Sequence, residues 1–381
     1  MPEPVEVQGT CEARFDAVRT TLAGQLASGA DLGATVAVSL HGEPVVDIWG
    51  GWADPERTRV WERDTITNVW STTKTMTFLC MLMLHDRGEL DFHAPVATYW
   101  PEFAQNGKEH VLVRHVMGHT AGLSGWDEPL AAEDLADWGK CTAALAAQAP
   151  WWEPGSASGY HAVTQGYLIG EILRRITGDT IGTWFAREVA KPLEADFHIG
   201  LPASEDHRVS NVVPPPPLNP QDFAGQVSEV MLKTFMNPPI DASMAHHEWW
   251  RRAEIPAANG QGNARSVAAV QSVVAGRGEA RGVRLLSPEG TEPIFEKQAN
   301  GIDKVLGVQQ HIGMGYGLSN PPEMPIGPRA CYWGGYGGSV IVMDQDAGLT
   351  VCYVMNRMES GLTGDTRGAD LVTAAFASLS S

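Results

Sequence analysis

The residues Ser71 and Lys74 have the types and the spacing needed for nucleophilic attack on a carbonyl carbon. Residues i and i+3 lie on the same face of a helix, so the lysine amine can sit beside the serine hydroxyl and accept its proton. A serine activated by such a base forms a covalent acyl intermediate without any histidine. The pair therefore indicates acyl-transfer chemistry, provided that one helix presents both side chains.

The flanking sequence predicts that this helix is buried. Residues 66–70 are largely β-branched or aromatic, and residues 75–84 (TMTFLCMLML) are nearly all apolar. Burial disfavours the charged form of a lysine, so it lowers the pKa of Lys74 and suits the amine to act as a base near neutral pH. An exposed pair would instead be a solvated helix turn. Only seven lysines occur in the chain, which makes a chance match uncommon.

A tyrosine that follows a turn-rich loop is the second candidate. Residues 152–160 (WEPGSASGY) end at Tyr160, just before an amphipathic segment that begins at His161. A tyrosine ordinarily titrates at about pH 10, but a neighbouring ammonium favours its phenolate. Tyr160 and Lys74 could then pass one proton between them. The alternative is a tyrosine that packs in the core or caps the helix.

A glycine-rich run at residues 333–338 (WGGYGG) leads into a C-terminal strand. Glycine at a strand edge lets the backbone come close to a ligand, and an edge N–H group there can point at a developing oxyanion. The N–H group of Ser71, at a helix N-terminus, supplies a second donor. A simple bulge before the strand is the alternative.

The apolar pattern predicts the elements that hold these residues. Both ends of the chain supply two strands and a helix: a helix at 11–29 with strands at 34–40 and 44–49, and strands at 338–343 and 348–355 with a helix at 366–379. Between these two ends of the chain, apolar residues recur with a helical period in five segments, 72–87, 129–148, 161–177, 181–191 and 264–276. We therefore expect an α+β fold, in which one antiparallel sheet is built from both termini and flanked by the terminal helices, beside a mostly helical lobe.

The sheet lobe is assigned to residues 1–70 and 326–381, and the helical lobe to residues 71–325. Within the helical lobe, residues 207–256 differ because they include four consecutive prolines, several methionines and two adjacent tryptophans. Proline prevents regular structure, and methionine and tryptophan offer adaptable apolar surface. We interpret this segment as the wall of a substrate pocket; an ordinary connecting segment is the alternative.

Charge and composition narrow the choice of partners. The chain has 381 residues and a net charge of −18 without any basic run, which disfavours nucleic acid and anionic membranes. The five cysteines are scattered, so neither a metal site nor a disulfide framework is predicted. No signal peptide and no uncharged stretch of about 20 apolar residues is evident, so we expect a soluble cytoplasmic protein.

Taken together, Ser71-Thr72-Thr73-Lys74, Tyr160 and Trp333-Gly334-Gly335 resemble the Ser-x-x-Lys, Tyr-x-Asn and Lys-Thr-Gly motifs of the serine β-lactamase and penicillin-binding protein superfamily. The resemblance is specifically to its family VIII carboxylesterase branch and extends over about residues 12–380. The supporting segments that look alike are 119–123, 152–155, 259–262 and 348–356.

The resemblance implies a β-lactamase/DD-peptidase-like fold with the active site between the lobes, and a serine carboxylesterase that hydrolyses short- to medium-chain esters. It implies that Ser71 is the nucleophile, Lys74 its base, and Tyr160 the general acid that also helps activate water for deacylation. The backbone N–H groups of Ser71 and Tyr336 would form the oxyanion hole. Neither a metal nor an organic cofactor is implied.

Two departures from the family pattern bear on the substrate. Trp333 stands where penicillin-recognising members have a lysine, and it cannot attract a substrate carboxylate. Ala162 stands where they have the asparagine of the second motif. Both changes favour an uncharged ester held by apolar contacts over an amide or a β-lactam. The residues expected to contact it are Trp126, Trp151, Trp152, Trp333, Gly334, Gly335 and Tyr336.

Three other functions stay open on the sequence alone: an acyltransferase that uses the same acyl-enzyme, a weak β-lactamase or peptidase, and a catalytically silent ligand-binding protein on this fold. The chain has no Gly-x-Ser-x-Gly elbow. His115 and His119 have an i, i+4 spacing that can bind zinc, but no glutamate follows His115, so we interpret both as structural. The expected partner is a small-molecule ester, and a homo-oligomer is compatible with the sequence.

Overall fold

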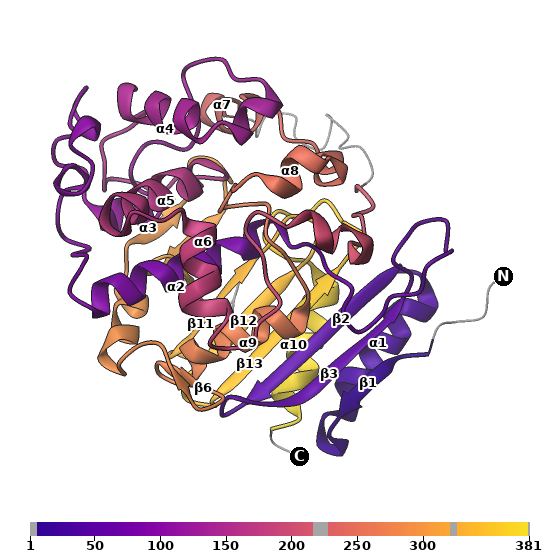
Figure 1. Cartoon of the computed structure of the whole chain (residues 1–381). Helices are drawn as coiled ribbons and strands as arrows, with labels where there is room; N and C mark the ends of the chain where they lie inside the picture. The colour runs from indigo at the N-terminus through magenta and orange to yellow at the C-terminus, as the bar shows by residue number, and fades with distance from the viewer. Residues whose placement is uncertain (1–5, 216–227, 321–325, 380–381) are drawn as a thin grey trace.

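The computed structural model describes residues 6–215, 228–320 and 326–379. Its main feature is an antiparallel sheet in the order β1-β3-β2-β13-β12-β11-β10-β9-β8 (Figure 1). The strands are β1 Gln8–Cys11, β2 Gly33–Leu40, β3 Glu43–Gly51, β8 Ala299–Ile302, β9 Gln309–Ile312, β10 Gly317–Leu318, β11 Ala330–Gly334, β12 Val340–Asp344 and β13 Leu349–Met355. Two short pairs lie outside it, β4 Thr67–Asn68 with β5 Gln261–Gly262, and β6 Glu279–Ala280 with β7 Val283–Arg284.

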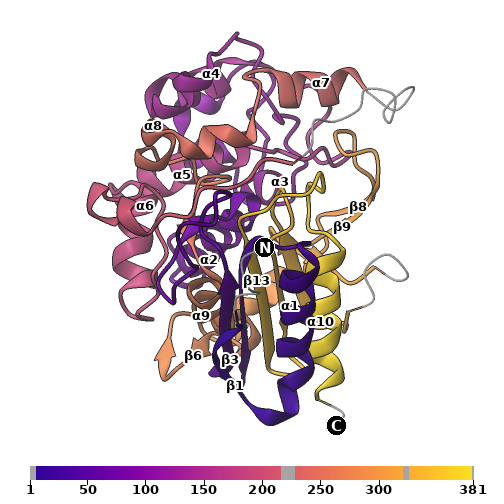
Figure 2. The same cartoon turned by 90° about the vertical axis from the view of Figure 1, so that its right-hand side faces the viewer.

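The helices cover the sheet on both faces and form a second lobe beside it. They are α1 Asp16–Ser28, α2 Thr73–Asp86, α3 Val113–Met117, α4 Trp138–Ala147, α5 Thr164–Thr177, α6 Ile181–Phe185, α7 Glu229–Met236, α8 Glu248–Arg252, α9 Ala264–Ala275 and α10 Thr366–Ala377. Helices α1 and α10 pack together on one face, and α9 contacts β2, β12 and β13 on the other (Figure 2). Within the described ranges, no helix combines the length and hydrophobicity required to cross a bilayer.

The centre of the sheet joins the two ends of the chain. Strand β2 pairs with β13 from Leu40 opposite Leu349 to Ala34 opposite Met355. Both strands are almost entirely buried, including residues on alternate faces. This explains why their sequences are continuous apolar runs: a sheet covered by helices on both faces has no solvent-facing side that would select polar residues.

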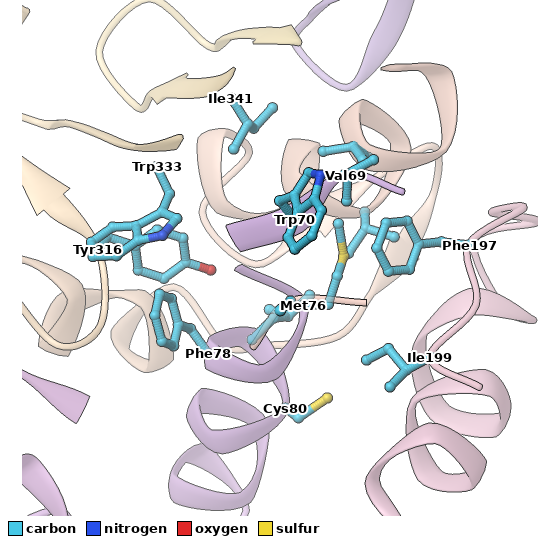
Figure 3. Packing of buried hydrophobic residues seen from close by; sticks show 14 of the residues in the cluster. Val69, Trp70, Met76, Phe78, Cys80, Phe197, Ile199, Tyr316, Trp333 and Ile341 are labelled. Atoms are coloured by element: carbon cyan, nitrogen blue, oxygen red, sulfur yellow. The ribbon is translucent and has the colours of Figure 1, made fainter. Parts of the chain in front are cut away.

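Helix α2 runs through the core between the two lobes. Figure 3 shows Met76 and Phe78 of this helix with Trp333 and Tyr316 on one side and Phe197 on the other. The ring of Phe78 meets those of Tyr316 and Trp333 edge to face, with centroids 5.2 and 5.7 Å apart. Residues at the start of α2 are therefore fixed relative to both the sheet and the helical lobe.

The α+β fold and the terminal strands and helices are those that the sequence predicts, but three expectations need correction. The sheet does not stop at residues 1–70 and 326–381, because β8, β9 and β10 come from residues 299–318 of the predicted helical lobe, and α9 packs on the sheet. These strands are two to four residues long and rich in glycine and glutamine, so they show little strand pattern.

The second and third corrections concern the helical lobe. The helix expected at 129–148 is split into a short 3-10 turn and α4, because Asp137 is extended and caps α4 by accepting from the N–H of Lys140. Residues 207–256 were expected to lack regular structure, yet they contain α7 and α8. Part of that segment, residues 216–227, lies outside the described residues.

Candidate active site

Ser71 lies in a tight turn that leads into α2. Residues Trp70–Thr72 form a 3-10 turn directly before the helix. Trp70 has a φ of 50°, a left-handed conformation that a bulky residue rarely adopts and that clusters at functional sites. Its indole is held between Trp250 and Tyr336, with ring centroids 5.5 and 5.4 Å away. The turn presents the Ser71 hydroxyl at the base of a pocket.

Lys74 is fully buried, and its amine has four oxygen neighbours. The Nζ atom lies 3.0 Å from Ser71 Oγ and 3.1 Å from the Tyr160 hydroxyl. It donates to the carbonyl oxygens of Ala162 and Ala257, at 2.7 and 3.0 Å. Burial lowers the pKa of Lys74 well below its ordinary value of 10.5. A neutral amine has two protons for the two carbonyls and one lone pair left for the serine proton.

The Ala257 carbonyl is held in place by a network around the start of α2. The side chain of Asn68 donates to the carbonyl oxygen of Ala258 at 3.0 Å, and the Gly260 N–H group donates to Thr73 Oγ1 at 2.9 Å. Strand β4 pairs with β5 next to these bonds. The 259–262 segment that resembles the family therefore has a positioning part in the site. Sequence reasoning missed the two carbonyls that bind Lys74, because a backbone oxygen has no residue-type signal.

Tyr160 completes the group of proton-transfer side chains. Its hydroxyl donates to Ser71 Oγ at 2.6 Å. Burial raises the pKa of Tyr160 above its ordinary value of 10.0, and the nearby charge of Asp303 acts in the same direction. Burial thus opposes the phenolate that a neighbouring ammonium would favour. The site favours a neutral phenol beside a neutral amine, since both charged forms are disfavoured by desolvation.

A cavity of about 560 Å³ opens above Ser71. Its lining is almost entirely apolar, and the described residues that form it include no Lys, Arg, Asp or Glu. The residues that line it are Trp70, Ser71, Tyr160, Ala162, Val163, Met231, Leu232, Phe235, Met236, Ile240, Ala258, Tyr336, Ser360 and Leu362. Helix α7, inside the segment interpreted as a pocket wall, contributes four of these side chains, of which Leu232 and Met236 are 51% and 61% exposed. The methionines were the sequence signal for this wall; Val163 and Leu362 had none.

Two of the tryptophans expected to contact substrate lie elsewhere, which corrects that prediction. Trp126 is 3% exposed, donates to the carbonyl oxygen of Cys141 and packs on Tyr167 in the core. Trp152 donates to the carbonyl oxygen of Ala157 within its own loop. Neither lines the cavity, because each indole N–H group already has an internal acceptor, Trp126 in the core and Trp152 within its own half-buried loop.

Trp151 and the Trp333-Gly334-Gly335 motif border the site without lining the main cavity. The ring of Trp151 lies under the Lys233 ammonium of α7, 5.5 Å from its centroid. Trp333 and Gly334 line a separate cavity of about 10 Å³ beside Tyr160. A Cβ atom at Gly335 would lie 2.4 Å from the carbonyl oxygen of Val69, so glycine is needed for the end of β11 to approach the serine turn.

Tyr336 follows this close approach and lines the main cavity, as expected. On either side of it, the Gly335 N–H group donates to the carbonyl oxygen of Ser339 and the Gly337 N–H group to that of Gly361, at 2.8 and 2.9 Å. These bonds fix the backbone around Tyr336 next to the turn that carries Ser71. In the described part of the chain, no group of three or more His, Cys, Asp or Glu side chains is placed to hold a metal ion.

Comparison with known proteins agrees with this geometry. The family model described as Beta-lactamase matches residues 18–375. The chain is 35% identical to the Mycobacterium tuberculosis protein "Esterase/beta-lactamase LipL", over 93% of this chain and 84% of that protein. A solved structure of a family VIII carboxylesterase is 40% identical, with a TM-score of 0.93 over 98% of this chain and all of the other. A penicillin-binding protein homologue from Caulobacter crescentus is 38% identical, with a TM-score of 0.91 over 98% and 99% of the two chains.

The resemblance seen in the motifs thus extends over the whole fold. Because the family model spans nearly the entire chain, and the similar structures superpose over almost all of it, the protein is a member of the beta-lactamase family.

Proposed function

We propose that this protein is a serine carboxylesterase that hydrolyses uncharged esters through an acyl-enzyme on Ser71. The observation that carries the proposal is the contact of one serine hydroxyl with both a buried amine and a buried phenol, at the base of an apolar cavity. Similar proteins support an ester substrate, since one is named an esterase/β-lactamase and another a family VIII carboxylesterase.

Acylation begins with neutral Lys74. Its lone pair accepts the Ser71 proton while Oγ attacks the ester carbonyl carbon, which gives a tetrahedral oxyanion. The backbone N–H groups of Ser71 and Tyr336 stabilise this oxyanion. The Tyr160 hydroxyl protonates the leaving alkoxide as the C–O bond breaks, and the Lys74 ammonium returns a proton to the phenolate. The products are an alcohol, the Ser71 acyl ester, and both proton-transfer groups in their starting forms.

Deacylation reverses these roles with water as the nucleophile. Neutral Lys74 gains one proton as water attacks, because the Tyr160 hydroxyl takes a proton from the water and gives its own to the amine, and the tetrahedral intermediate collapses to a carboxylic acid. The serine oxygen then recovers its proton from Lys74. No step requires a charge on the substrate. This matches a cavity in which none of the described lining residues is a cation that could bind the carboxylate of a β-lactam.

The test is active-site labelling combined with a series of esters. The protein is incubated with a fluorophosphonate, and intact mass and peptide mapping locate the adduct; turnover of p-nitrophenyl esters is measured in parallel, with a chromogenic cephalosporin for comparison. We expect one adduct, on Ser71, and turnover of the esters. An adduct on another serine, or no adduct, would contradict the mechanism. A kcat/KM for the cephalosporin equal to that for the esters would contradict the substrate class.

The pH dependence follows from the pKa shifts of the two proton-transfer groups. Burial lowers the pKa of Lys74 well below 10.5, which favours the neutral amine that acts as the base. The pKa of Tyr160 is raised above 10.0, so the acid keeps its proton in mildly alkaline solution. We expect kcat/KM, measured with a pH-stat on an unactivated ester, to show a plateau from neutral pH to about pH 10. A rate that keeps rising up to the ordinary lysine pKa would show that Lys74 is charged in the free enzyme.

Acyl-chain preference should follow the apolar lining from α7. Each methylene group buried contributes about 0.8 kcal/mol, so kcat/KM is expected to rise about four-fold per carbon until the cavity is filled. Phe235→Ala removes a ring from the wall and should lower kcat/KM for hexanoate by about ten-fold while acetate changes little. The control is Phe376→Ala, on α10 behind the sheet. Equal losses for acetate and hexanoate would show that α7 does not contact the acyl chain.

A further inference from the structure

Three consecutive backbone N–H groups around Tyr160 are bound by only two residues from distant parts of the chain. The Gly159 N–H group donates to the carbonyl oxygen of His119 at 3.0 Å. The Tyr160 N–H group donates to Asp303 Oδ1 at 3.0 Å, and the His161 N–H group donates to His119 Nδ1 at 3.0 Å. The segment that carries the phenol is therefore fixed on both sides.

Asp303 is built into the interior to make this contact. It is 1% exposed, and its Oδ1 atom also accepts from the N–H groups of Val305 and Leu306, both at 2.9 Å. Its second oxygen, Oδ2, is buried without a hydrogen-bond partner among the described residues. A buried carboxylate with one unpaired oxygen is costly, and such groups in native proteins call for a reason beyond folding.

His119 is buried as well, and its backbone has a strained conformation. It is fully buried and has a φ of 59°, in the left-handed region that histidine seldom occupies. Since Nδ1 accepts a hydrogen bond, its proton must be on Nε2, and burial keeps the ring neutral by lowering its pKa well below 6.5. Burial thus favours the neutral ring, whose Nδ1 atom can accept from the His161 N–H group. His115, four residues earlier, instead accepts from the Leu112 N–H group, so the Nδ1 atoms of the two histidines have different hydrogen-bond donors.

The ring of His119 also contacts the rings of Trp333 and Tyr160. It stacks on the Trp333 indole with centroids 5.5 Å apart and an interplanar angle of 12°, and it lies 5.2 Å from the Tyr160 ring. The tryptophan that replaces a family lysine thus supports the histidine that holds the tyrosine. Any loosening of this support would move the phenol hydroxyl away from Ser71 Oγ.

We propose that His119 and Asp303 are positioning residues that act on the reaction through Tyr160, by holding its backbone so that the phenol reaches Ser71. The proposal rests on the proposed function, because it assumes that Tyr160 transfers a proton. Misplacement of a reacting group by about 1 Å can cost about 100-fold in rate. Loss of either acceptor should therefore lower kcat more than it changes KM.

The experiment compares each acceptor with a conservative replacement. His119→Phe keeps an aromatic ring on Trp333 but removes Nδ1, and Asp303→Ala removes Oδ1. Each is expected to lower kcat for p-nitrophenyl butyrate by about 10- to 100-fold. His119→Asn, which tolerates a positive φ and offers a side-chain oxygen, and Asp303→Asn should each recover most of that loss. The proposal would be overturned if the variant that removes the acceptor and the variant that keeps it had equal kcat at both positions.

The same variants in a Tyr160→Phe background separate positioning from general destabilisation. If the two residues act through the phenol, they should change kcat by less than about two-fold once the hydroxyl is gone, because effects of groups acting as one unit are not additive. Full additivity would overturn the proposal even if every variant folds. His115→Ala is the matched control. His115 is also buried and accepts a backbone N–H group, but that group belongs to Leu112 and not to the segment that carries Tyr160, so the variant should leave kcat unchanged. A Tyr160→Phe enzyme with wild-type kcat would refute the role of Tyr160 itself, which is a distinguishable result.

Discussion

Replacement of Ser71 by alanine is expected to abolish ester hydrolysis, with a loss in kcat of at least about 10⁴-fold. The hydroxyl is the atom to which the acyl group becomes bonded, and its two hydrogen-bond partners, Lys74 and Tyr160, have no other nucleophile to activate at this position. Burial of both partners is independent of the serine, so the pocket should stay intact. The measurement is turnover of p-nitrophenyl butyrate together with fluorophosphonate labelling, which should disappear.

A matched control for this variant is Ser272→Ala in α9. Ser272 is also buried, and its hydroxyl donates to the carbonyl oxygen of Ala268 within α9, a helix that packs on the sheet. Its replacement removes the same atom from the protein and should leave kcat and labelling unchanged. A double variant that lacks all catalytic activity, purified in the same way, measures the background activity of the preparation. Activity of Ser71→Ala above that background would refute the acyl-enzyme.

Replacement of Lys74 by methionine is expected to lower kcat by about 10³- to 10⁴-fold, near the upper end of what a general base contributes. Methionine has nearly the length of lysine and suits an apolar interior, so the variant removes the amine without opening a cavity. Ser71 and Tyr160 remain in contact, which makes the expected defect one of proton transfer. Because the serine hydroxyl would lack its base, labelling by a fluorophosphonate should also slow by a similar factor.

The chain offers a second buried lysine as the control. Lys108 is 0% exposed and donates to the carbonyl oxygens of Gln105 and Gln148, far from the serine turn in the sequence. Burial lowers its pKa to about 8, so it shares the physical situation of Lys74 without its neighbours. Lys108→Met should change stability but not the chemical step. If both lysine variants lose kcat equally at equal thermal stability, the effect of Lys74→Met is structural and the assigned base is wrong.

The site illustrates why an enzyme tolerates a costly interior. Lys74 is fully buried, and the four oxygen contacts of its amine include no carboxylate. The fold disfavours its charged form, so burial weakens stability at neutral pH while it creates a base. The backbone carbonyls of Ala162 and Ala257 limit that cost, because they satisfy the two protons of the neutral amine. Stability is thus exchanged for a lone pair directed at the nucleophile.

Several parts of the protein follow from local sequence alone. Ser71 and Lys74 meet because three residues of helix always bring two side chains to one face, and the apolar run after them could only form a buried helix. The hairpin of β2 and β3 and the strands β12 and β13 are continuous apolar segments separated by short turns, which predict the centre of the sheet. Such features depend on contacts between near neighbours, whose geometry repeats with a known period.

Other parts were decided only by tertiary packing. Strand β10 pairs with β11, β9 pairs with β10, and β8 with β9, although the sequences of these three strands show little pattern. Trp126 and Trp152, which we expected to contact substrate, donate to backbone carbonyl oxygens away from the cavity, Trp126 in the core and Trp152 in its half-buried loop, while α7 supplies the wall instead. Side-chain type alone could not rank these outcomes, because each depends on which surfaces the folded chain leaves uncovered.

The protonation states of the site residues also depend on tertiary packing. The sequence by itself determined which residues could exchange a proton, since Ser71, Lys74 and Tyr160 carry the required groups. Tertiary structure lowers the pKa of the amine and raises that of the phenol, so that the neutral form of each is favoured, because only the folded chain removes water from the two groups together and places two backbone carbonyls on the amine. Desolvation is a property of the whole surrounding interior, and no single residue along the chain encodes it.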